Sequence, residues 1–313
     1  MSDPRIEALL VGAIDLHCHS GPSVMPRSLN HVEAIEQAEA AGLRAILFKD
    51  HYYSVTPVVA LLEETMPDRK IALLSGVPCN NTTGGLNAYA VEHGFKLGAK
   101  IVWMPTFSAA NHIRHSYRKK FLPTKDAMLE PTALTVLDQR GKLVDEVLPI
   151  LDQIARYDGI LSGGHLHISE IFALFDEAKR RGVTRLLVNH PNFLIDAKLP
   201  DMTELAAMGA YLEHSTCMWA GIQGRNYDND SLDRMIRAGG VDHTIIGSDL
   251  GQVGNPTPVD GFRHVIAMCI ELGYSDADIR RMIGGNAATL AGLDETAPAE
   301  IADAGKEPAL SLQ

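Results

Sequence analysis

Two histidines at the end of a short apolar segment are the first residues in the chain whose spacing suggests chemistry. His17 and His19 end the run AIDLHCH, which begins at Ala13. Side chains alternate along a strand with a period of two, so both imidazoles would lie on the same side of a strand. Two imidazoles at this spacing can bind one divalent cation from the strand end. Alone the pair is a weak signal, because H-x-H also arises by chance.

Three more candidate metal ligands stand at the ends of other apolar segments. His165 follows GILSGG, His190 follows RLLVN, and Asp249 follows TIIGS. Imidazole and carboxylate groups suit one or two divalent ions, zinc foremost, with manganese, iron or nickel as alternatives. Histidines scattered by chance would not coincide with segment ends. The pattern therefore predicts that these residues converge on one metal site.

Eight short apolar segments would position these residues. They cover residues 13–17, 45–49, 71–76, 100–104, 159–163, 185–189, 210–214 and 244–248. Such near-continuous hydrophobic runs are typical of buried parallel strands, and amphipathic helical stretches lie between several of them. The pattern predicts an α/β fold, namely a closed (β/α)8 TIM-type barrel. An open nucleotide-binding sheet is disfavoured, because no G-x-G-x-x-G follows the first strand. The candidate ligands would then meet at the C-terminal rim, where barrel enzymes have their active sites.

Capping residues indicate where several helices begin and end. Asn30 is expected to cap the run HVEAIEQAEAA, and Gly42 to end it. Ser169 is expected to cap the helix EIFALFDEAKRR. Ser275 and Asp278 open the last long helix as a variant capping box.

One long segment interrupts the repeat. Residues 105–147 follow the fourth strand and are too long for a simple loop, so we expect an insertion that serves as a lid or an interface arm, with a small hairpin turning at Arg140-Gly141. The rest of residues 1–293 would form a single barrel domain. The tail 294–313 is rich in Ala, Pro, Glu and Asp, and we expect it to be disordered.

Composition narrows the classes of protein to which the chain can belong. The formal net charge of −11 argues against nucleic acid as the main partner. No apolar stretch approaches the ~18 residues of a membrane span, and no secretory signal is recognisable. Four scattered cysteines form no C-x-x-C pair, so we expect a cytoplasmic protein with reduced thiols and a small-molecule substrate. The basic run at 111–120 either attracts an anion to the rim or is a solvated charge run, and its His112 and His115 are not expected to bind metal.

The ligand pattern resembles the amidohydrolase superfamily of metal-dependent hydrolases. The order H-x-H, His, His and Asp on strands 1, 5, 6 and 8 carries the resemblance, and GGNAATLAGL near the end is similar to an Asn-Ala-Ala-x-x-x-Gly-Leu ending common in that superfamily. The resemblance implies that His17, His19 and Asp249 serve a first metal and that His165 and His190 serve a second or shared position. It also implies that Asp249 takes a proton from the attacking water.

Strand 4 departs from the superfamily pattern. Many binuclear members have a carboxylated lysine or a glutamate there, whereas this chain has Trp103-Met104-Pro105-Thr106. Strand 2 instead ends with Lys49-Asp50-His51, in which Lys49 and His51 share a face. This ending and DLHCHS resemble the PHP phosphoesterases, although a glutamate after strand 3 and an Asp-x-His after strand 8 are missing.

The roles of the strand 2 residues remain open at this point. An ammonium group beside a metal cation is strongly repelled, so Lys49 is a carboxylated bridging ligand, a binder of a substrate anion or a plain surface lysine. His51 is a metal ligand or a substrate contact, or else a packed histidine of the rim.

Four further residues are candidate substrate-binding groups. His167 shares a face with His165, and Gln252 and Asn255 follow Asp249 closely enough to bond a substrate. Glu213, at the end of strand 7, could also orient a ligand imidazole, as carboxylates behind metal-bound histidines do. The alternative for Glu213 is an ordinary surface position.

The sequence thus predicts a metal-dependent hydrolase that activates water to cleave an amide, ester or lactone bond. A metal-dependent decarboxylase of the same superfamily and a PHP-type phosphoesterase are alternatives, as is a barrel that has lost catalysis. The chain is a possible homo-oligomer, in which the insertion would pack against a second subunit.

Overall fold

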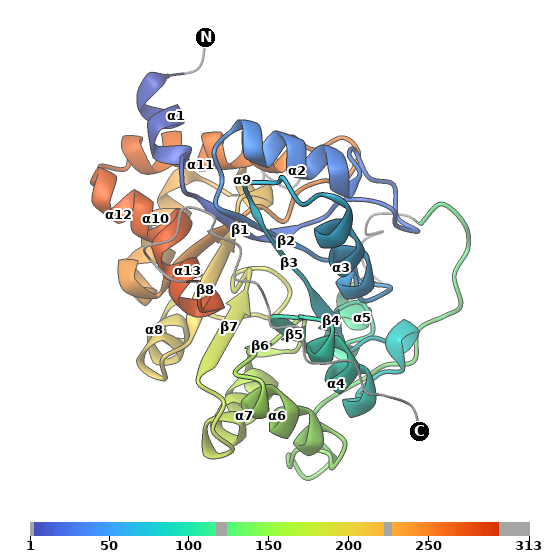
Figure 1. The fold of residues 1–313 in the computed structure, drawn as a ribbon. Helices are drawn as coiled ribbons and strands as arrows, with labels where there is room; N and C mark the ends of the chain where they lie inside the picture. The colour runs from blue at the N-terminus through green and yellow to red at the C-terminus, as the bar shows by residue number, and fades with distance from the viewer. Residues whose placement is uncertain (1–2, 117–123, 222–226, 294–313) are drawn as a thin grey trace.

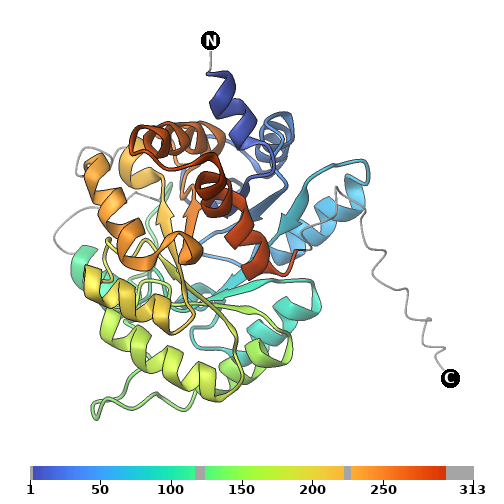
Figure 2. The same cartoon turned by 90° about the vertical axis from the view of Figure 1, so that its left-hand side faces the viewer.

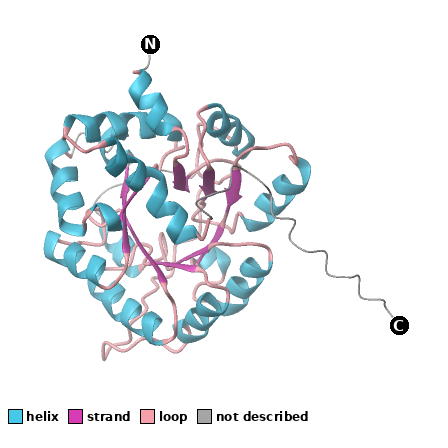
Figure 3. Ribbon diagram, turned by 60° about the vertical axis from the view of Figure 1, so that its left-hand side comes forward, coloured by secondary structure: helices cyan, strands magenta, loops and turns pink. Residues whose placement is uncertain are grey.

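A barrel of parallel strands inside a layer of helices makes up the structure, a computed structural model that describes residues 3–116, 124–221 and 227–293 (Figures 1 and 3). Every paired strand runs parallel to its neighbour. The strands are β1 (Ile14–Cys18), β2 (Ala45–Phe48), β3 (Ala72–Leu74), β4 (Gly76–Pro78), β5 (Ile101–Trp103), β6 (Ile160–Ser162), β7 (Arg185–Asn189), β8 (Tyr211–Ser215) and β9 (Thr244–Gly247). The predicted α/β barrel is confirmed, and each predicted strand segment overlaps an observed one.

The helices follow the strands in alternation and surround them on the outside (Figure 2). They are α1 (Pro4–Leu10), α2 (His31–Ala40), α3 (Thr56–Thr65), α4 (Ala88–Lys96), α5 (Ala110–Ser116), α6 (Val147–Arg156), α7 (Ile168–Arg180), α8 (Leu199–Ala207), α9 (Cys217–Ala220), α10 (Asn229–Gly239), α11 (Pro258–Glu271), α12 (Asp276–Arg280) and α13 (Asn286–Ala291). No helix in the described ranges is long and apolar enough to cross a membrane.

The predicted third strand is observed as two, because the chain changes partners at Ser75. β3 pairs with β2, whereas β4 pairs with β5. The carbonyl of Ser75 already accepts a hydrogen bond from the amide of Lys100, on the β5 side (2.8 Å). At Gly76 the two strands approach so closely that a Cβ would lie 2.3 Å from the carbonyl oxygen of Ile101. Glycine therefore permits the change of sheet.

The barrel closes between β1 and the segment that follows β9. The amide of Asp249 donates to the carbonyl of His17 (2.7 Å), and the amide of His19 donates to that of Leu250 (2.8 Å). The buried carboxylate of Asp15 accepts from the amides of both His17 and Ser248, each at 2.9 Å. These bonds hold the ends of the first and last strands side by side.

Apolar side chains fill the barrel and the space beneath the helices. One cluster draws residues from seven strands around the barrel, among them Leu16, Leu47, Trp103 and Leu187, together with α13. Residues from strands on all sides can meet only in the interior. A larger cluster lies between the strands and the surrounding helices.

Two of the three predicted helix starts are confirmed. Asn30 caps α2 in a capping box with Glu33, and Ser275 with Asp278 caps α12, which continues through a π turn (Arg281–Gly285) into α13. The prediction that Ser169 caps α7 is wrong. His167 is the capping residue. Its Nδ1 accepts from the amide of Ser169 (3.3 Å), and the carboxylate of Glu170 accepts from the amide of His167 (3.1 Å).

The predicted insertion contains α5 and an extended path to α6. A tight turn occurs at the predicted position: the amide of Asp138 donates to the carbonyl of Lys142 (2.7 Å), and Gly141 has a φ of +75°. Glu170 of α7 ties the insertion to the barrel by accepting from Thr135 (2.5 Å) and from the amide of Val136 (3.2 Å). Residues 117–123 of the insertion lie outside the described residues. The tail 294–313, for which the sequence predicts disorder, lies outside them as well.

Candidate metal centre

Three of the predicted ligands meet at the C-terminal rim of the barrel. His17 and His19 come from the end of β1, and Asp249 follows β9. Asp249 Oδ1 lies 3.3 Å from His17 Nε2 and 3.1 Å from His19 Nε2. One ligand atom from each of these three residues lies within 4.8 Å of the other two, so the group could hold a metal ion. It is the group of this kind found within the described ranges.

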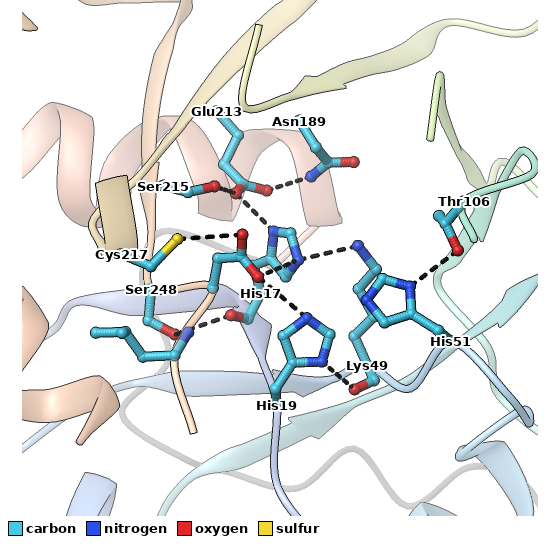
Figure 4. A network of polar contacts seen from close by, with 12 residues as sticks. His17, His19, Lys49, His51, Thr106, Asn189, Glu213, Ser215, Cys217 and Ser248 are labelled. Carbon is cyan, nitrogen blue, oxygen red and sulfur yellow. Dashed lines mark hydrogen bonds and ion pairs between the residues drawn. The ribbon is translucent and has the colours of Figure 1, made fainter. Parts of the chain in front are cut away.

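The other nitrogen of each imidazole has a fixed hydrogen bond (Figure 4). His17 Nδ1 donates to Glu213 Oε1 at 2.7 Å, and His19 Nδ1 donates to the carbonyl of Lys49 at 2.9 Å. Both acceptors lack a proton, so each imidazole keeps one on Nδ1, and its Nε2 faces Asp249. Burial lowers the pKa of His19 to about 3, with Arg27 adding to the effect, so this ring is neutral near pH 7.

Glu213 sits wholly buried behind His17. Its carboxylate accepts from the hydroxyl of Ser215 (2.8 Å) and from the side-chain amide of Asn189. Burial raises the pKa of Glu213, but His17 outweighs that effect and leaves the pKa below its ordinary value. Glu213 therefore orients a candidate ligand, as the sequence suggested. It does not line the cavity, so its predicted contact with substrate stays a prediction.

The backbone at the rim adopts conformations that side chains usually avoid. His190 has a φ of +33° directly after β7, and Asp249 has a φ of +49° two residues after the end of β9. Such conformations cost of order 1–3 kcal/mol and persist only where the surroundings hold them. Gly251 is held equally tightly: at its φ of +118°, a Cβ would lie 1.6 Å from the carbonyl oxygen of His19. The packing of β1 against the loop after β9 imposes this geometry.

Lys49 is buried at the centre, with 1% of its surface exposed, so the surface-lysine interpretation is wrong. Its Nζ lies 2.9 Å from His17 Nε2 and 5.4 Å from the centre of the Trp103 ring. Burial lowers the pKa of the amine, although Asp249 and Glu213 oppose the shift. The amine is therefore hydrogen-bonded to the same His17 nitrogen that would bind a metal.

The remaining predicted ligands line the same cavity as the centre. The His51 ring lies 5.0 Å from the His19 ring and 5.6 Å from the His165 ring. The rings of His165 and His190 lie 5.1 Å apart. His51 is oriented by a 2.9 Å bond from its Nδ1 to the hydroxyl of Thr106. His190 Nδ1 is buried and has no hydrogen-bond partner within the described residues.

His112 is part of this site, which the sequence analysis missed by treating it as one member of a basic run. Its Nδ1 lies 2.8 Å from that of His165, and the two rings stack with centroids 4.9 Å apart. One Nδ1 must donate and the other accept, so the pair shares a proton along this bond. The feature that sets His112 apart from the basic run is the buried face of α5. Asn111 and His112 lie on that face, whereas Arg114 and His115 are exposed. The basic residues at 118–120 lie outside the described part.

The predicted substrate contacts divide into two groups. Gln252 and Asn255 line the cavity, and the Asn255 amide donates to Gln252 Oε1 (2.9 Å). His167 does not line it, and its predicted contact with substrate stays a prediction. Its ring caps α7 and lies 3.9 Å from the carboxylate of Asp196.

The cavity itself is small and mostly apolar, with a volume of about 90 Å³. A neighbouring cavity of about 590 Å³ shares His51, Phe107 and His112 with it. Sequence motifs pointed to none of the other lining residues, which are Met25, Arg27, Phe107, Phe193, Leu194, Cys217 and Met218. The Cys217 thiol donates to Asp249 Oδ2 (3.3 Å). Burial and Asp249 raise the pKa of this thiol far above its ordinary value, so Cys217 acts as a donor and not as a thiolate.

A family model matches residues 12–213, which is more than half of the chain. The chain belongs to the family of unknown function DUF6282. The matched range contains His17, His19, Lys49, His165 and His190, whereas Asp249 follows it. Among curated proteins, a search found no match to this chain.

Solved structures with the same fold come from the amidohydrolase superfamily. An amidohydrolase from Pseudomonas aeruginosa is 13% identical, with a TM-score of 0.61, over 93% of this chain and 98% of its own. The probable dipeptidase PvdM from the same organism is 11% identical, with a TM-score of 0.65 and the same coverage of both chains. A 2,6-dihydroxybenzoate decarboxylase from Rhizobium is 12% identical, with a TM-score of 0.58, over 90% of this chain and 99% of its own. At these identities the likeness is one of fold, and at that level the predicted resemblance is confirmed.

Proposed function

We propose that this member of the DUF6282 family is a metal-dependent hydrolase that activates water to cleave an amide, ester or lactone bond of a small molecule. One observation carries the proposal: two imidazoles and one carboxylate bring ligand atoms within 4.8 Å of one another, on the rim of a fold shared with amidohydrolases. Barrel enzymes place their active sites at this rim.

The residues present fit a divalent cation. Two imidazole nitrogens and a carboxylate oxygen are a donor set that zinc accepts, and manganese, iron and nickel accept it as well. Glu213 and the carbonyl of Lys49 hold the two rings in the orientation that such a site needs. The unpartnered Nδ1 of His190 is a further donor within reach of the same cavity. When bound, the metal would make water more acidic and polarise the scissile carbonyl group.

Asp249 is the group best placed to move a proton. Burial raises its pKa, but His17 and His19 outweigh this effect and hold the pKa well below the ordinary value. The carboxylate is thus ionised near pH 7 and can accept a proton from water. Oδ1 faces the two imidazoles, while Oδ2 faces the Cys217 thiol. The same carboxyl group can afterwards pass the proton to the leaving group.

Metal analysis tests this proposal. Protein purified without chelator should carry about one to two equivalents of divalent metal, and His17→Ala/His19→Ala should lose it because two of the ligands are gone. The matched control is His93→Ala/His115→Ala, which removes two exposed histidines. Full metal occupancy in the His17/His19 variant would contradict the assignment.

A second candidate is non-oxidative decarboxylation at a single metal. The small, mostly apolar cavity favours it, because this reaction needs no attacking water beside the substrate. Decarboxylases of dihydroxybenzoates share the fold, and one of them was solved with bound manganese. Two product assays separate the reactions. A hydrolase incorporates ¹⁸O from labelled water into its product, whereas a decarboxylase releases CO₂ and incorporates none.

A further inference from the structure

Arg27 places a buried positive charge on the wall of the cavity. It lies in the loop between β1 and α2, and its side chain is only 4% exposed. The backbone of this loop pairs with the loop that carries Asp249: Arg27 forms an antiparallel bridge with Gln252, and the amide of Ser28 donates to the carbonyl of Gly251 (2.9 Å). The backbone that carries this side chain is therefore held beside the loop of Asp249.

Most of the hydrogen-bonding capacity of Arg27 is unused. Nη2 contacts Asp50 Oδ2 at 3.3 Å and the sulfur of Met25 at 3.9 Å. Among the described residues, neither the buried Nε nor Nη1 has a hydrogen-bond partner. Asp50 in turn is engaged with the amide of Tyr52 through its other oxygen (2.8 Å). A charge-assisted bond is usually shorter, about 2.7–2.9 Å, and arginine often pairs with carboxylates through two nitrogens.

Comparable arginines elsewhere in the chain use both of their terminal nitrogens, although the Nε of each is buried without a partner among the described residues, as in Arg27. Arg69 uses Nη1 to bond the carbonyls of Glu63 and Met66, both at 3.0 Å, and Nη2 to reach the Glu63 carboxylate at 3.3 Å. Arg185 uses Nη1 for two carbonyls of α13, both at 2.8 Å, and Nη2 for Asp158 at 2.7 Å. Each of them fastens two segments together. Arg27 lines a cavity instead and keeps donors available.

We propose that Arg27 binds a carboxylate group of the substrate, while the metal centre holds the scissile bond. This inference rests on the proposed function and specifies its substrate class. One guanidinium matches one carboxylate in charge and geometry. The apolar residues of the wall, among them Phe107, Phe193 and Met218, match an aromatic or aliphatic body. The substrate class is thus a small, largely apolar carboxylic acid. We assign this carboxylate to Arg27 and not to Lys49, because the Lys49 amine is already bonded to His17.

Calorimetric titration with simple probes tests the assignment. The metal-loaded wild type is titrated with benzoate, phenylacetate and hexanoate, and with neutral benzamide. Arg27→Met should bind the carboxylates about 10- to 100-fold more weakly, the effect of losing charge-assisted hydrogen bonds, and should bind benzamide unchanged. Arg69→Met is the matched control, because Arg69 is similarly buried but lies outside the cavity. Equal carboxylate affinity in Arg27→Met and the wild type would overturn the proposal, as would failure of all three carboxylates to bind the wild type.

A carboxylate can also bind a metal directly, so the titrations are repeated on chelator-treated protein. The difference between the wild type and Arg27→Met should persist there, since Arg27 does not depend on the metal. Its disappearance would assign the carboxylate to the metal and overturn the proposal. A protein that carries no metal but still binds carboxylates through Arg27 would contradict the hydrolase proposal alone.

Asp50 supplies a second variant that works in the opposite direction. Arg27→Met leaves the Asp50 carboxylate buried without its cation, which can impair folding. Asp50→Asn keeps an oxygen for the amide of Tyr52 and removes the competing charge. It should therefore bind benzoate more tightly than the wild type, and the neutral pair Arg27→Met/Asp50→Asn should bind it weakly. Weaker binding in Asp50→Asn would overturn the proposal.

Discussion

Lys49 is the residue on which the number of metals depends. Its amine lies 2.9 Å from His17 Nε2, a nitrogen that a metal would need, so an ammonium group there would compete with the metal. Reaction of the neutral amine with CO₂ gives a carbamate and releases one proton, which turns the competitor into an anionic ligand. Burial lowers the pKa of the amine and so makes the neutral form more accessible.

We expect Lys49→Met to lose metal and activity together, with partial rescue by formate or acetate. Methionine keeps most of the packing of the lysine stem, which guards against a stability artefact. Metal content is measured by mass spectrometry in parallel with turnover, and Lys49→Ala serves as the second variant. If both variants retain wild-type metal content and added carboxylate has no effect, Lys49 is not a bridging ligand. A mononuclear centre would then be the better interpretation.

Asp249 combines a ligand oxygen with a basic oxygen, and Asp249→Asn separates the two functions. Asparagine keeps the shape and one ligand oxygen but cannot accept the proton. We expect kcat to fall at least ~10²-fold while metal is retained in part. Cys217→Ser is the control, because a serine hydroxyl can still donate to Asp249 Oδ2. Near-normal turnover in Asp249→Asn would show that another group takes the proton.

Among the elements of the barrel, the junction between β3 and β4 is the point at which the chain passes from pairing with β2 to pairing with β5. A Cβ at Gly76 would lie 2.3 Å from the carbonyl oxygen of Ile101 and 2.7 Å from the Trp103 ring. Neither group can move freely, since β4 and β5 are paired there and Trp103 is fully buried. Gly76→Ala must therefore separate the two strands or fail to fold.

We expect Gly76→Ala to lower the free energy of unfolding by at least about 1–3 kcal/mol, the usual cost of overpacking a core. Urea denaturation followed by circular dichroism measures the difference. Gly285→Ala is the matched control, because its nearest neighbouring atom would be 3.9 Å from the new Cβ and its φ is helical. Equal stability of Gly76→Ala and the wild type would mean that the strands are not closely packed at this point.

At the scale of the whole molecule, buried neutral histidines make the protein sensitive to acid. Burial lowers the pKa of His31 and of His214 to about 4. Neither His214 nitrogen has a hydrogen-bond partner within the described residues. In the unfolded chain a histidine takes up its proton near pH 6.5. Between about pH 6.5 and 4 the unfolded state thus binds more protons, so stability is full above this window and falls as the pH is lowered through it.

His214→Leu should flatten this dependence by close to one proton, or about 1.4 kcal/mol per pH unit. The measurement is the free energy of unfolding in urea from pH 4.5 to 7.5, with chelator present to remove any contribution from metal. His93→Leu, at an exposed position, should leave the slope unchanged. An unaltered slope in His214→Leu would show that this imidazole titrates alike in both states.

The sequence by itself determined the fold and most of the candidate centre, because both follow from local patterns. Apolar runs mark strands, glycines and capping residues mark helix ends, and parallel strands in a barrel must bring His17, His19 and Asp249 to one rim. Its errors were also local. The cap of α7 lies two residues before Ser169. The segment with Ser75 and Gly76 changes strand partners, and this change depends on the neighbouring strand β5, which a glycine alone does not reveal.

Only the tertiary structure decided how the side chains around the centre meet. The contact of Lys49 with His17 spans 32 positions, that of Glu213 with His17 spans 196, and that of His112 with His165 spans 53. Arg27 became a candidate only when its loop was seen beside the loop after β9. Such contacts depend on loop paths and on burial, since the same arginine or lysine would be an ordinary solvated charge if its loop turned outward. Periodicity shows which face a residue takes, whereas packing decides what that residue touches.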